Sequence, residues 1–513
     1  MFSQNQRFHF LLALILFFTH FLYFYSMDFI NKNIHWLSFL LGIALSLFMY
    51  LVNPFALDAN ANKAVAVAVL MITWWIAEAL PMPAVALIPL VLHPLFKIGT
   101  IEETSKAYSN PVIFLFMGGF MIGLAIEKWN LHKRIALHIV KRTGTSGDRI
   151  ILGFIIATGF LSMWLSNTAT TMMMFPIALS VIAVMKDHEQ PGTSMKNFSM
   201  VLMLVIAYAS NIGGMGTIIG TPPNVAFVGF IEKKYNYTVQ FSDWLLVCTP
   251  LAILLLAALY WVLAKWMFPS KIKSSTEATA FIADEISSLG KLSVAEKRVL
   301  IIFIATALLW ITKDLINQLN FFKLDDNMIA IIGALALFAT ASGYKKEGKT
   351  QMVLEWHDTS KMAWGILLLF GGGIAMANSL EKAGVMSQVG NWLASFSHVN
   401  GLALVFMIVV ISIFLSEVMS NVAQVIVFAP VMAALADALH LDPLLLGIPM
   451  TLAASAASMM PMGTPPNAIV FSSGYIKLKD MMRAGFVMNI VSIILITLFC
   501  WFVLPLVMSV VMK

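Results

Sequence analysis

The chain has 513 residues, of which 60% are hydrophobic and only 11% are charged, and its formal net charge is +6. This composition excludes an ordinary soluble domain and indicates a protein with many membrane-spanning helices. The positive excess needs no nucleic-acid partner, because Lys and Arg gather in the cytoplasmic loops of membrane proteins.

Apolar runs of about 20 residues recur from one end of the chain to the other, each long enough to cross a hydrocarbon layer of roughly 30 Å. We predict eleven spans, together with two hairpins that enter the membrane and return. The third span is expected to be tilted or broken around Pro81 and Pro83. In the first half the spans lie near 9–27, 35–53, 63–95, 111–127, 197–232 and 243–268, with a basic interfacial helix at 129–142 and a hairpin at 148–185.

The second half repeats this plan. Its spans lie near 297–317, 327–343, 362–380, 443–476 and 481–510, with an interfacial helix at 385–397 and a hairpin at 400–438. We therefore divide the chain into an N-terminal span (1–34), a first repeat (35–268), a polar cytoplasmic linker (269–296) and a second repeat (297–513).

The distribution of basic residues predicts the orientation of the chain. With the N-terminus in the cytoplasm of a plasma-membrane protein, 23 of the 32 Lys and Arg fall in inside segments. Five spans then separate corresponding points of the two halves. The two repeats are therefore expected to be inverted relative to each other, with one hairpin entering from each side.

Two polar tripeptides lie in the centres of the hairpins, and they carry most of the functional argument. Ser166-Asn167-Thr168 and Ser420-Asn421-Val422 are 254 positions apart, and each is followed by the same pentapeptide, at Gly220–Asn224 and Gly463–Asn467. Paired prolines remove two amide donors and interrupt a helix. The sequence thus predicts an all-α polytopic membrane protein with an inverted repeat, two re-entrant hairpins and two broken helices.

The chemistry of these loops suits an anion accompanied by small cations. Hydroxyls and amides donate to an anionic oxygen, freed carbonyls ligate a cation, and half-helix N-termini favour negative charge. No Lys, Arg or His occurs in 160–185, 207–224, 412–428 or 451–467. A dianion would therefore need bound cations to neutralise it. Glu417, an intramembrane acid, is expected to hold its hairpin rather than to carry a proton.

With these paired motifs, and with Glu78-Ala79-Leu80-Pro81, residues 40–510 resemble the divalent anion/sodium symporter family, which carries dicarboxylates, citrate and in some branches sulfate. The resemblance implies a homodimer in membrane lipid, with a scaffold and a mobile domain that moves as an elevator. It implies one sodium site at Ser162, Ser166, Asn167 and Gly220, and a second at Ser416, Met419, Asn421 and Gly463. It implies that the substrate meets Asn167, Thr168, Thr221, Pro222, Asn421, Val422, Thr464 and Pro465, with Val422 in place of a threonine.

The sequence therefore predicts a secondary transporter, rather than an enzyme, that imports a C4-dicarboxylate such as succinate, malate or fumarate with co-transported sodium ions. Citrate, sulfate and dicarboxylate exchange remain alternatives. An intramembrane enzyme would need a nucleophile–base pair or an aspartate dyad, which the polar centres lack. A channel would need a filter ring around an axis, for which inverted repeats with buried hairpins are not typical.

Overall fold

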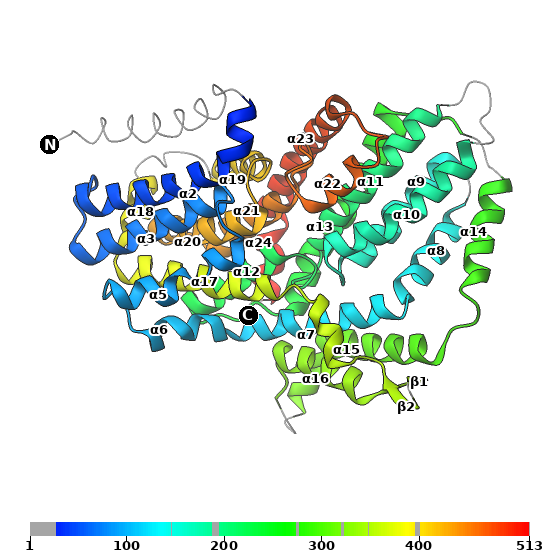
Figure 1. Cartoon of the computed structure of the whole chain (residues 1–513), viewed down its shortest axis with the longest axis horizontal. Helices are drawn as coiled ribbons and strands as arrows, with labels where there is room; N and C mark the ends of the chain where they lie inside the picture. The colour runs from blue at the N-terminus through cyan, green and yellow to red at the C-terminus, as the bar shows by residue number, and fades with distance from the viewer. Residues whose placement is uncertain are drawn as a thin grey trace.

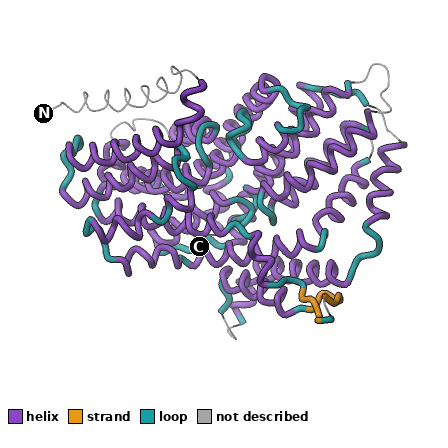
Figure 2. Tube along the Cα trace, viewed as in Figure 1, coloured by secondary structure: helices purple, strands orange, loops and turns teal. Residues whose placement is uncertain are grey.

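The computed structural model describes residues 27–144, 146–186, 194–272, 276–319, 323–346, 348–394 and 401–511, and nearly all of them are helical (Figures 1 and 2). Nine helices in these ranges are long and apolar enough to cross a membrane, and five shorter apolar helices accompany them. The predicted polytopic all-α fold is confirmed. The predicted first span, 9–27, lies outside the described residues except for Met27.

The first half contains one helical hairpin and one interrupted helix, as predicted. The hairpin is formed by α9 and α10, and the interrupted helix by α11 and α12. In chain order the elements are α2 (Met27–Val52), α3 (Ala59–Ile76), α4 (Met82–Val85), α5 (Ile88–Leu95), α6 (Ile101–Ser105), η1 (Lys106–Ser109), α7 (Pro111–Lys128), α8 (Leu131–Thr143), α9 (Gly147–Ser162), α10 (Asn167–Lys186), α11 (Met195–Gly214), α12 (Pro222–Tyr235), α13 (Phe241–Leu259) and the π-helical continuation η2 (Tyr260–Met267).

The second half has the same two devices, a hairpin of α19 and α20 and an interrupted helix of α21 and α22. Its elements are α14 (Thr276–Ser288), α15 (Val294–Gln318), α16 (Asp326–Ala339), β1 (Ala341–Lys346), β2 (Lys349–Met352), η3 (Trp356–Lys361), α17 (Trp364–Lys382), α18 (Val385–Ala394), α19 (Gly401–Ser416), α20 (Asn421–Leu439), α21 (Pro443–Ser455), α22 (Pro465–Phe471), α23 (Leu478–Phe502) and α24 (Leu504–Val511).

One predicted break is present in the structure, and two other predicted segments differ from it in detail. The span at 63–95 is indeed broken, since α3 ends at Ile76 and Glu78 has φ of 47° before Pro81. The span predicted at 327–343 is wrong at its end, because α16 stops at Ala339 and β1 pairs antiparallel with β2. The polar linker contains a helix, α14, which packs against α8 and α10. Figure 2 shows the small β-hairpin in orange beside α15 and α16.

Each hairpin packs on the interrupted helix of its own half, and the two halves also interlock. α11 lies against α9 and α10, and α21 lies against α19 and α20. Across the halves, α22 packs on α10 and α11, while α12 packs on α20 and α21 (Figure 1). The hairpin tips and the helix breaks are thereby gathered in one part of the helical assembly.

Glycines allow the closest of these approaches. A methyl group on Gly213 of α11 would overlap the backbone of Gly159 in α9, and one on Gly485 of α23 would overlap the backbone at Ser458 and Met459. At these points main chain packs on main chain with no side chain between. The first hairpin is therefore fastened to the first interrupted helix, and α23 to the break in the second.

Candidate functional site

The first helix break, residues 215–221, separates α11 from α12 and is stabilised by its own pentapeptide. Thr221 is extended (φ −145°, ψ 140°), and Pro222 and Pro223 occupy the first turn of α12, where a missing N–H costs nothing. The amide nitrogen of Asn224 donates to the carbonyl oxygens of Gly214 (3.2 Å) and Thr217 (2.8 Å). The final residue of the motif thus satisfies carbonyls that the interruption frees.

The tip of the first hairpin meets this break through Asn167. The Oγ of Ser162 lies 2.8 Å from the Oδ1 of Asn167, and this carboxamide oxygen faces the carbonyl oxygens of Ser210 and Gly220. In the opposite amide orientation the nitrogen donates to the carbonyls of Ser210 (3.1 Å) and Gly220 (3.2 Å) and to Ser162 Oγ. Without a cation the second orientation satisfies more hydrogen bonds, whereas a cation among these oxygens would favour the first.

Backbone carbonyls converge on the same point. A methyl group built on Gly220 would lie 2.5 Å from the carbonyl oxygen of Gly214 and 3.0 Å from that of Ser162. Together with Asn167 Oδ1 and Ser162 Oγ these atoms form an oxygen-rich cradle, which we call the first cradle. Oxygen ligands from carbonyls, hydroxyls and amides, with no thiolate or imidazole, are typical for a hard monovalent or divalent cation.

The second helix break, residues 456–464, is organised by a carboxylate. Glu417, in the turn of the second hairpin, is 4% exposed and accepts hydrogen bonds from the backbone N–H groups of Ser458 (2.8 Å), Met459 (2.8 Å) and Met460 (2.9 Å). The amide of Asn489 in α23 donates to it as well (2.7 Å). These four bonds support the structural role that the sequence predicts for Glu417, because they join hairpin tip, helix break and α23.

The second cradle lies around Gly463. A methyl group there would be 3.3 Å from Glu417 Oε2, 3.4 Å from the carbonyl oxygen of Met460 and 3.6 Å from that of Ser416. The hydroxyl of Ser416 donates to the carbonyl of Ala454, and Met419 is buried beside the tip. Thr464 caps α22 by accepting from the N–H of Asn467 (3.4 Å), and the amide of Asn467 donates to the carbonyl of Met460 (3.0 Å).

One residue that sequence reasoning missed joins the two cradles. Asn211, in the last turn of α11, is 2% exposed, and its Nδ2 donates to the hydroxyl oxygen of Thr464 (3.0 Å). Its Oδ1 lies 3.4 Å from Asn167 Nδ2. The signal was present as a polar amide in an apolar run just before Gly213 and Gly214. The two halves of the site are therefore connected rather than separate.

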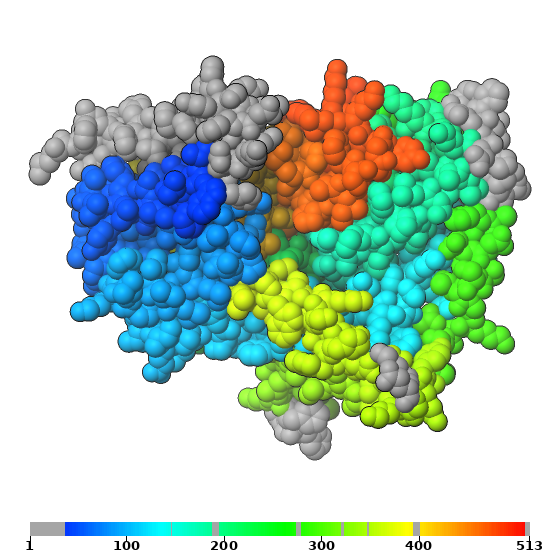
Figure 3. Space-filling model, viewed as in Figure 1, coloured from blue at the N-terminus to red at the C-terminus, as the bar shows by residue number. Residues whose placement is uncertain are grey.

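The structure brings most of the predicted residues together, at different depths. The buried ones are Ser162, Asn167, Gly220, Thr221, Ser416, Met419, Gly463 and Thr464, while Ser166, Thr168, Pro222, Asn421 and Val422 are half-buried and Pro465 is exposed. Ser166 uses its Oγ to accept from the N–H of Ala169 (3.2 Å). Within the described part of the chain, the side chain of Asn421 has no hydrogen-bond partner and remains available to a ligand. Figure 3 shows the face hollowed near its middle, beside the orange segment that contains α22.

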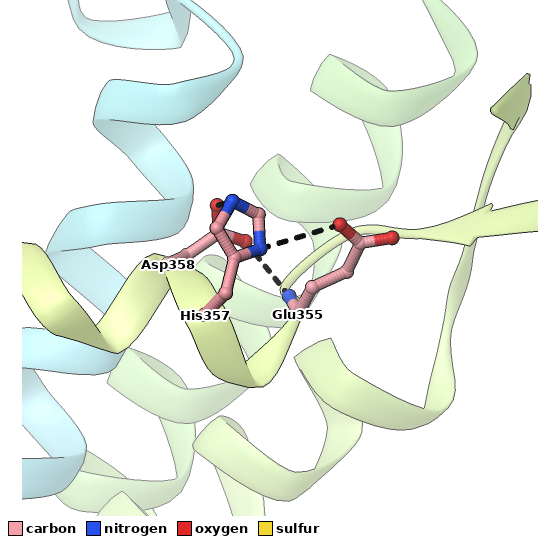
Figure 4. Close-up of side chains that lie close together, drawn as sticks. All are labelled: Glu355, His357 and Asp358. Atoms are coloured by element: carbon pink, nitrogen blue, oxygen red, sulfur yellow. Dashed lines mark hydrogen bonds and ion pairs between the residues drawn. The ribbon is translucent and has the colours of Figure 1, made fainter.

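A separate group of possible metal donors lies at the start of η3, between the two sets of motifs in the chain. Glu355, His357 and Asp358 place one donor atom each within 4.8 Å of one another (Figure 4). Asp358 is already engaged, since its Oδ2 accepts from Lys128 (2.7 Å) and from the N–H of Glu355 (2.8 Å). Burial raises the pKa of Asp358, but the bonds from Lys128 and Glu355 outweigh it and hold the pKa below its usual value. Glu355 and Asp358 thus cap the start of η3, and Asp358 forms an ion pair with Lys128. These contacts account for the group without a metal ion.

Comparison with known protein families identifies the family of this chain. The family model described as the sodium:sulfate symporter transmembrane region matches residues 32–509. The chain belongs to this family. The predicted family and the predicted class, a membrane transporter rather than an enzyme, are both confirmed.

Relatives with similar sequences span almost the whole chain. The sodium-dependent dicarboxylate transporter SdcS of Staphylococcus saprophyticus is 38% identical over 498 residues, which is 95% of each protein. That of Staphylococcus aureus strain USA300 is 37% identical over 481 residues, 92% of each. In fold, the chain is similar to the YdaH transporter of Alcanivorax borkumensis, with a TM-score of 0.55 at 13% identity, covering 84% of this chain and 97% of that one.

Proposed function

We propose that this protein imports C4-dicarboxylates, such as succinate, malate or fumarate, together with sodium ions. The observation that carries the proposal is the pair of oxygen-lined cradles joined through Asn211, in loops that contain no Lys, Arg or His. A dianion in such a site needs cations beside it, since an unpaired buried charge costs several kcal/mol. The names of the relatives, sodium-dependent dicarboxylate transporters, support the same substrate and ion.

In this proposal each cradle holds one sodium ion. The first ion is ligated by Ser162, Ser166, Asn167 and Gly220, and the second by Ser416, Met419, Asn421 and Gly463. The carboxylates of the substrate lie between the hairpin tips and the helix starts. The groups that receive them are Asn167, Thr168, Thr221 and Pro222 in the first half, and Asn421, Val422, Thr464 and Pro465 in the second.

The packing supports an elevator mechanism, and a homodimer is part of the same proposal. Hairpins and interrupted helices interlock across both halves, so they are suited to move as one domain against a scaffold that includes α7, α15 and α16. The inverted orientation of the repeats, the cytoplasmic N-terminus and the bacterial plasma membrane belong to the same proposal. The staphylococcal source of the relatives supports the last of these.

Uptake by purified protein in liposomes tests the function directly. We expect labelled succinate to accumulate several-fold when sodium is high outside, and to remain at background when potassium replaces sodium. Equal uptake in the two buffers would contradict symport. Stimulation by internal succinate without any gradient would indicate exchange. Stronger competition by sulfate or citrate than by malate would reassign the substrate, sulfate being the anion in the family's own description.

Substituting alanine for Gly220 is expected to reduce sodium-dependent uptake by tenfold or more. The added methyl group would meet two backbone carbonyl oxygens, which cannot move aside as a flexible side chain can, and such overpacking costs about 1–3 kcal/mol. Transport measured over a range of sodium concentrations should show a lower apparent affinity for sodium, so that more sodium is needed for half-maximal uptake. Gly99→Ala is the matched control, because its methyl would approach only the side chains of Glu103 and Thr104. Wild-type sodium dependence in Gly220→Ala would remove the first cradle from the proposal.

A further inference from the structure

The amide of Asn211 occupies a position between the first cradle and the second half of the site. It lies on α11, faces Asn167 on the first hairpin, and donates to Thr464 at the start of α22. The pentapeptides align Asn211 with Ala454 in the second half. An amide at this position is therefore not required to build an interrupted helix, and its presence in one half only points to a separate task.

We propose that Asn211 relays sodium occupancy of the first cradle to the hydroxyl groups that receive the substrate, so that bound sodium strengthens binding of the anion. The proposal rests on the function proposed above. Its physical basis is that a carboxamide has a donor end and an acceptor end. A chain of such groups can point its hydrogen bonds in one of two directions, and reversing the first group reverses the rest.

In the first direction, the oxygen of Asn167 points into the first cradle and its nitrogen points away. That nitrogen then donates to Asn211 Oδ1 (3.4 Å) and to Thr221 Oγ1 (3.5 Å), and Asn211 Nδ2 donates to Thr464 Oγ1 (3.0 Å). Both threonine hydroxyls accept in this arrangement. Their own hydrogens remain free to donate to a carboxylate.

In the second direction, the nitrogen of Asn167 points into the cradle and bonds the carbonyls of Ser210 and Gly220. Its oxygen then accepts from Thr221 and from the turned amide of Asn211, whose oxygen accepts the hydroxyl hydrogen of Thr464. Both hydroxyl hydrogens are consumed inside the protein. A carboxylate arriving at the site would meet lone pairs instead of donors.

Sodium selects between these directions because a cation in the cradle attracts the oxygen of Asn167 and repels its N–H₂ dipole. Binding of sodium in the first cradle thus frees the hydroxyl hydrogens of Thr221 and Thr464 to bond the substrate. Linkage makes the effect reciprocal, so that the bound anion also strengthens sodium binding. A charge-assisted hydrogen bond is strong enough for each donor to change anion affinity by about tenfold or more.

The relay is tested by measuring how strongly sodium enhances succinate binding to the purified full-length protein. Asn211→Leu keeps the shape of the side chain but removes both polar ends. We expect the enhancement, the ratio of succinate affinity with and without sodium, to fall about tenfold or more. The control is Asn62→Leu, another buried amide, which donates to the carbonyl of Tyr50 away from the site. It should keep the wild-type ratio.

Asn211→Asp separates a relay from a merely structural role. At pH 8 a carboxylate only accepts, so it holds the nitrogen of Asn167 outward and takes the hydrogen of Thr464. Labelled-sodium binding should therefore strengthen while succinate binding weakens, whereas simple disruption would weaken both. Should Asn211→Leu fail to fold, Thr464→Val should lose the enhancement and Thr464→Ser should keep it. An unchanged ratio in Asn211→Leu and in Thr464→Val would overturn the relay alone, and a wild-type protein with no sodium-dependent succinate binding would overturn the proposed function itself.

Discussion

Replacing Asn167 with alanine is expected to abolish sodium-driven succinate uptake, with a loss of at least about 100-fold. The side chain contributes an oxygen to the first cradle and contacts Ser162, Asn211 and Thr221. Losing two charge-assisted interactions of about 1.5–3 kcal/mol each accounts for an effect of this size. Initial uptake rates in liposomes, normalised to the amount of inserted protein, provide the measurement.

Asn421→Ala provides an informative comparison, because this side chain has no hydrogen-bond partner among the residues that the structure describes. We expect the same loss of transport with an unchanged melting temperature, whereas Asn167→Ala should also lower thermal stability. Asn62→Ala, in α3 and away from the cradles, should transport normally. Wild-type rates in either tip variant would exclude that residue from the site.

Replacing Glu417 with alanine is expected to cause the largest loss of stability of any single change at the site. Three backbone N–H groups and the amide of Asn489 would lose their acceptor in a buried position. Each buried donor left without an acceptor costs about 1–3 kcal/mol, so the combined loss is expected to be several kcal/mol. In detergent, the melting temperature followed by size-exclusion chromatography should fall by roughly 5–10 °C, and transport should be lost as the second break loses its shape.

Two variants bracket this result. Glu417→Gln keeps one carbonyl oxygen as an acceptor, so its melting temperature should lie between those of Glu417→Ala and the wild type. Glu102→Ala removes an exposed carboxylate that pairs with Lys106 at 3.4 Å, and should change stability very little. Equal stability of Glu417→Ala and Glu102→Ala would show that the carboxylate does not hold the helix break.

The sequence predicted the hairpins and the helix breaks because a local structural rule applied to each motif and the motif occurred in both halves of the chain. Both hairpins were predicted because the tripeptides at Asn167 and Asn421 lie at the centre of apolar stretches too long for one crossing. Both helix breaks were predicted because paired prolines interrupt hydrogen bonding at Thr221 and Thr464. The β-hairpin after Ala339 was missed, since a short polar strand pair following an apolar helix has no strong pattern of its own.

The hydrogen bonds that connect the parts of the site could not be predicted from the sequence in the same way. Asn211 has no counterpart in the second half, so the repeat gave no reason to single it out. Glu417 was recognised as an intramembrane acid, but its partners are backbone N–H groups more than 40 positions away. Such partners cannot be predicted from residue types, because every residue except proline has a backbone N–H group. Contacts of this kind depend on how α21 and α22 are placed against the hairpin.

The contact between Gly159 and Gly213 has a mechanical consequence. Two main chains in direct contact lock against each other, because a slide along either helix would drive the next side chain into the opposite backbone. We therefore expect α9 and α11 to move together as one rigid body. In the elevator mechanism proposed above, a substrate bound at the ends of these helices would keep the same surroundings during the movement, and the sliding surface would lie outside this pair of helices.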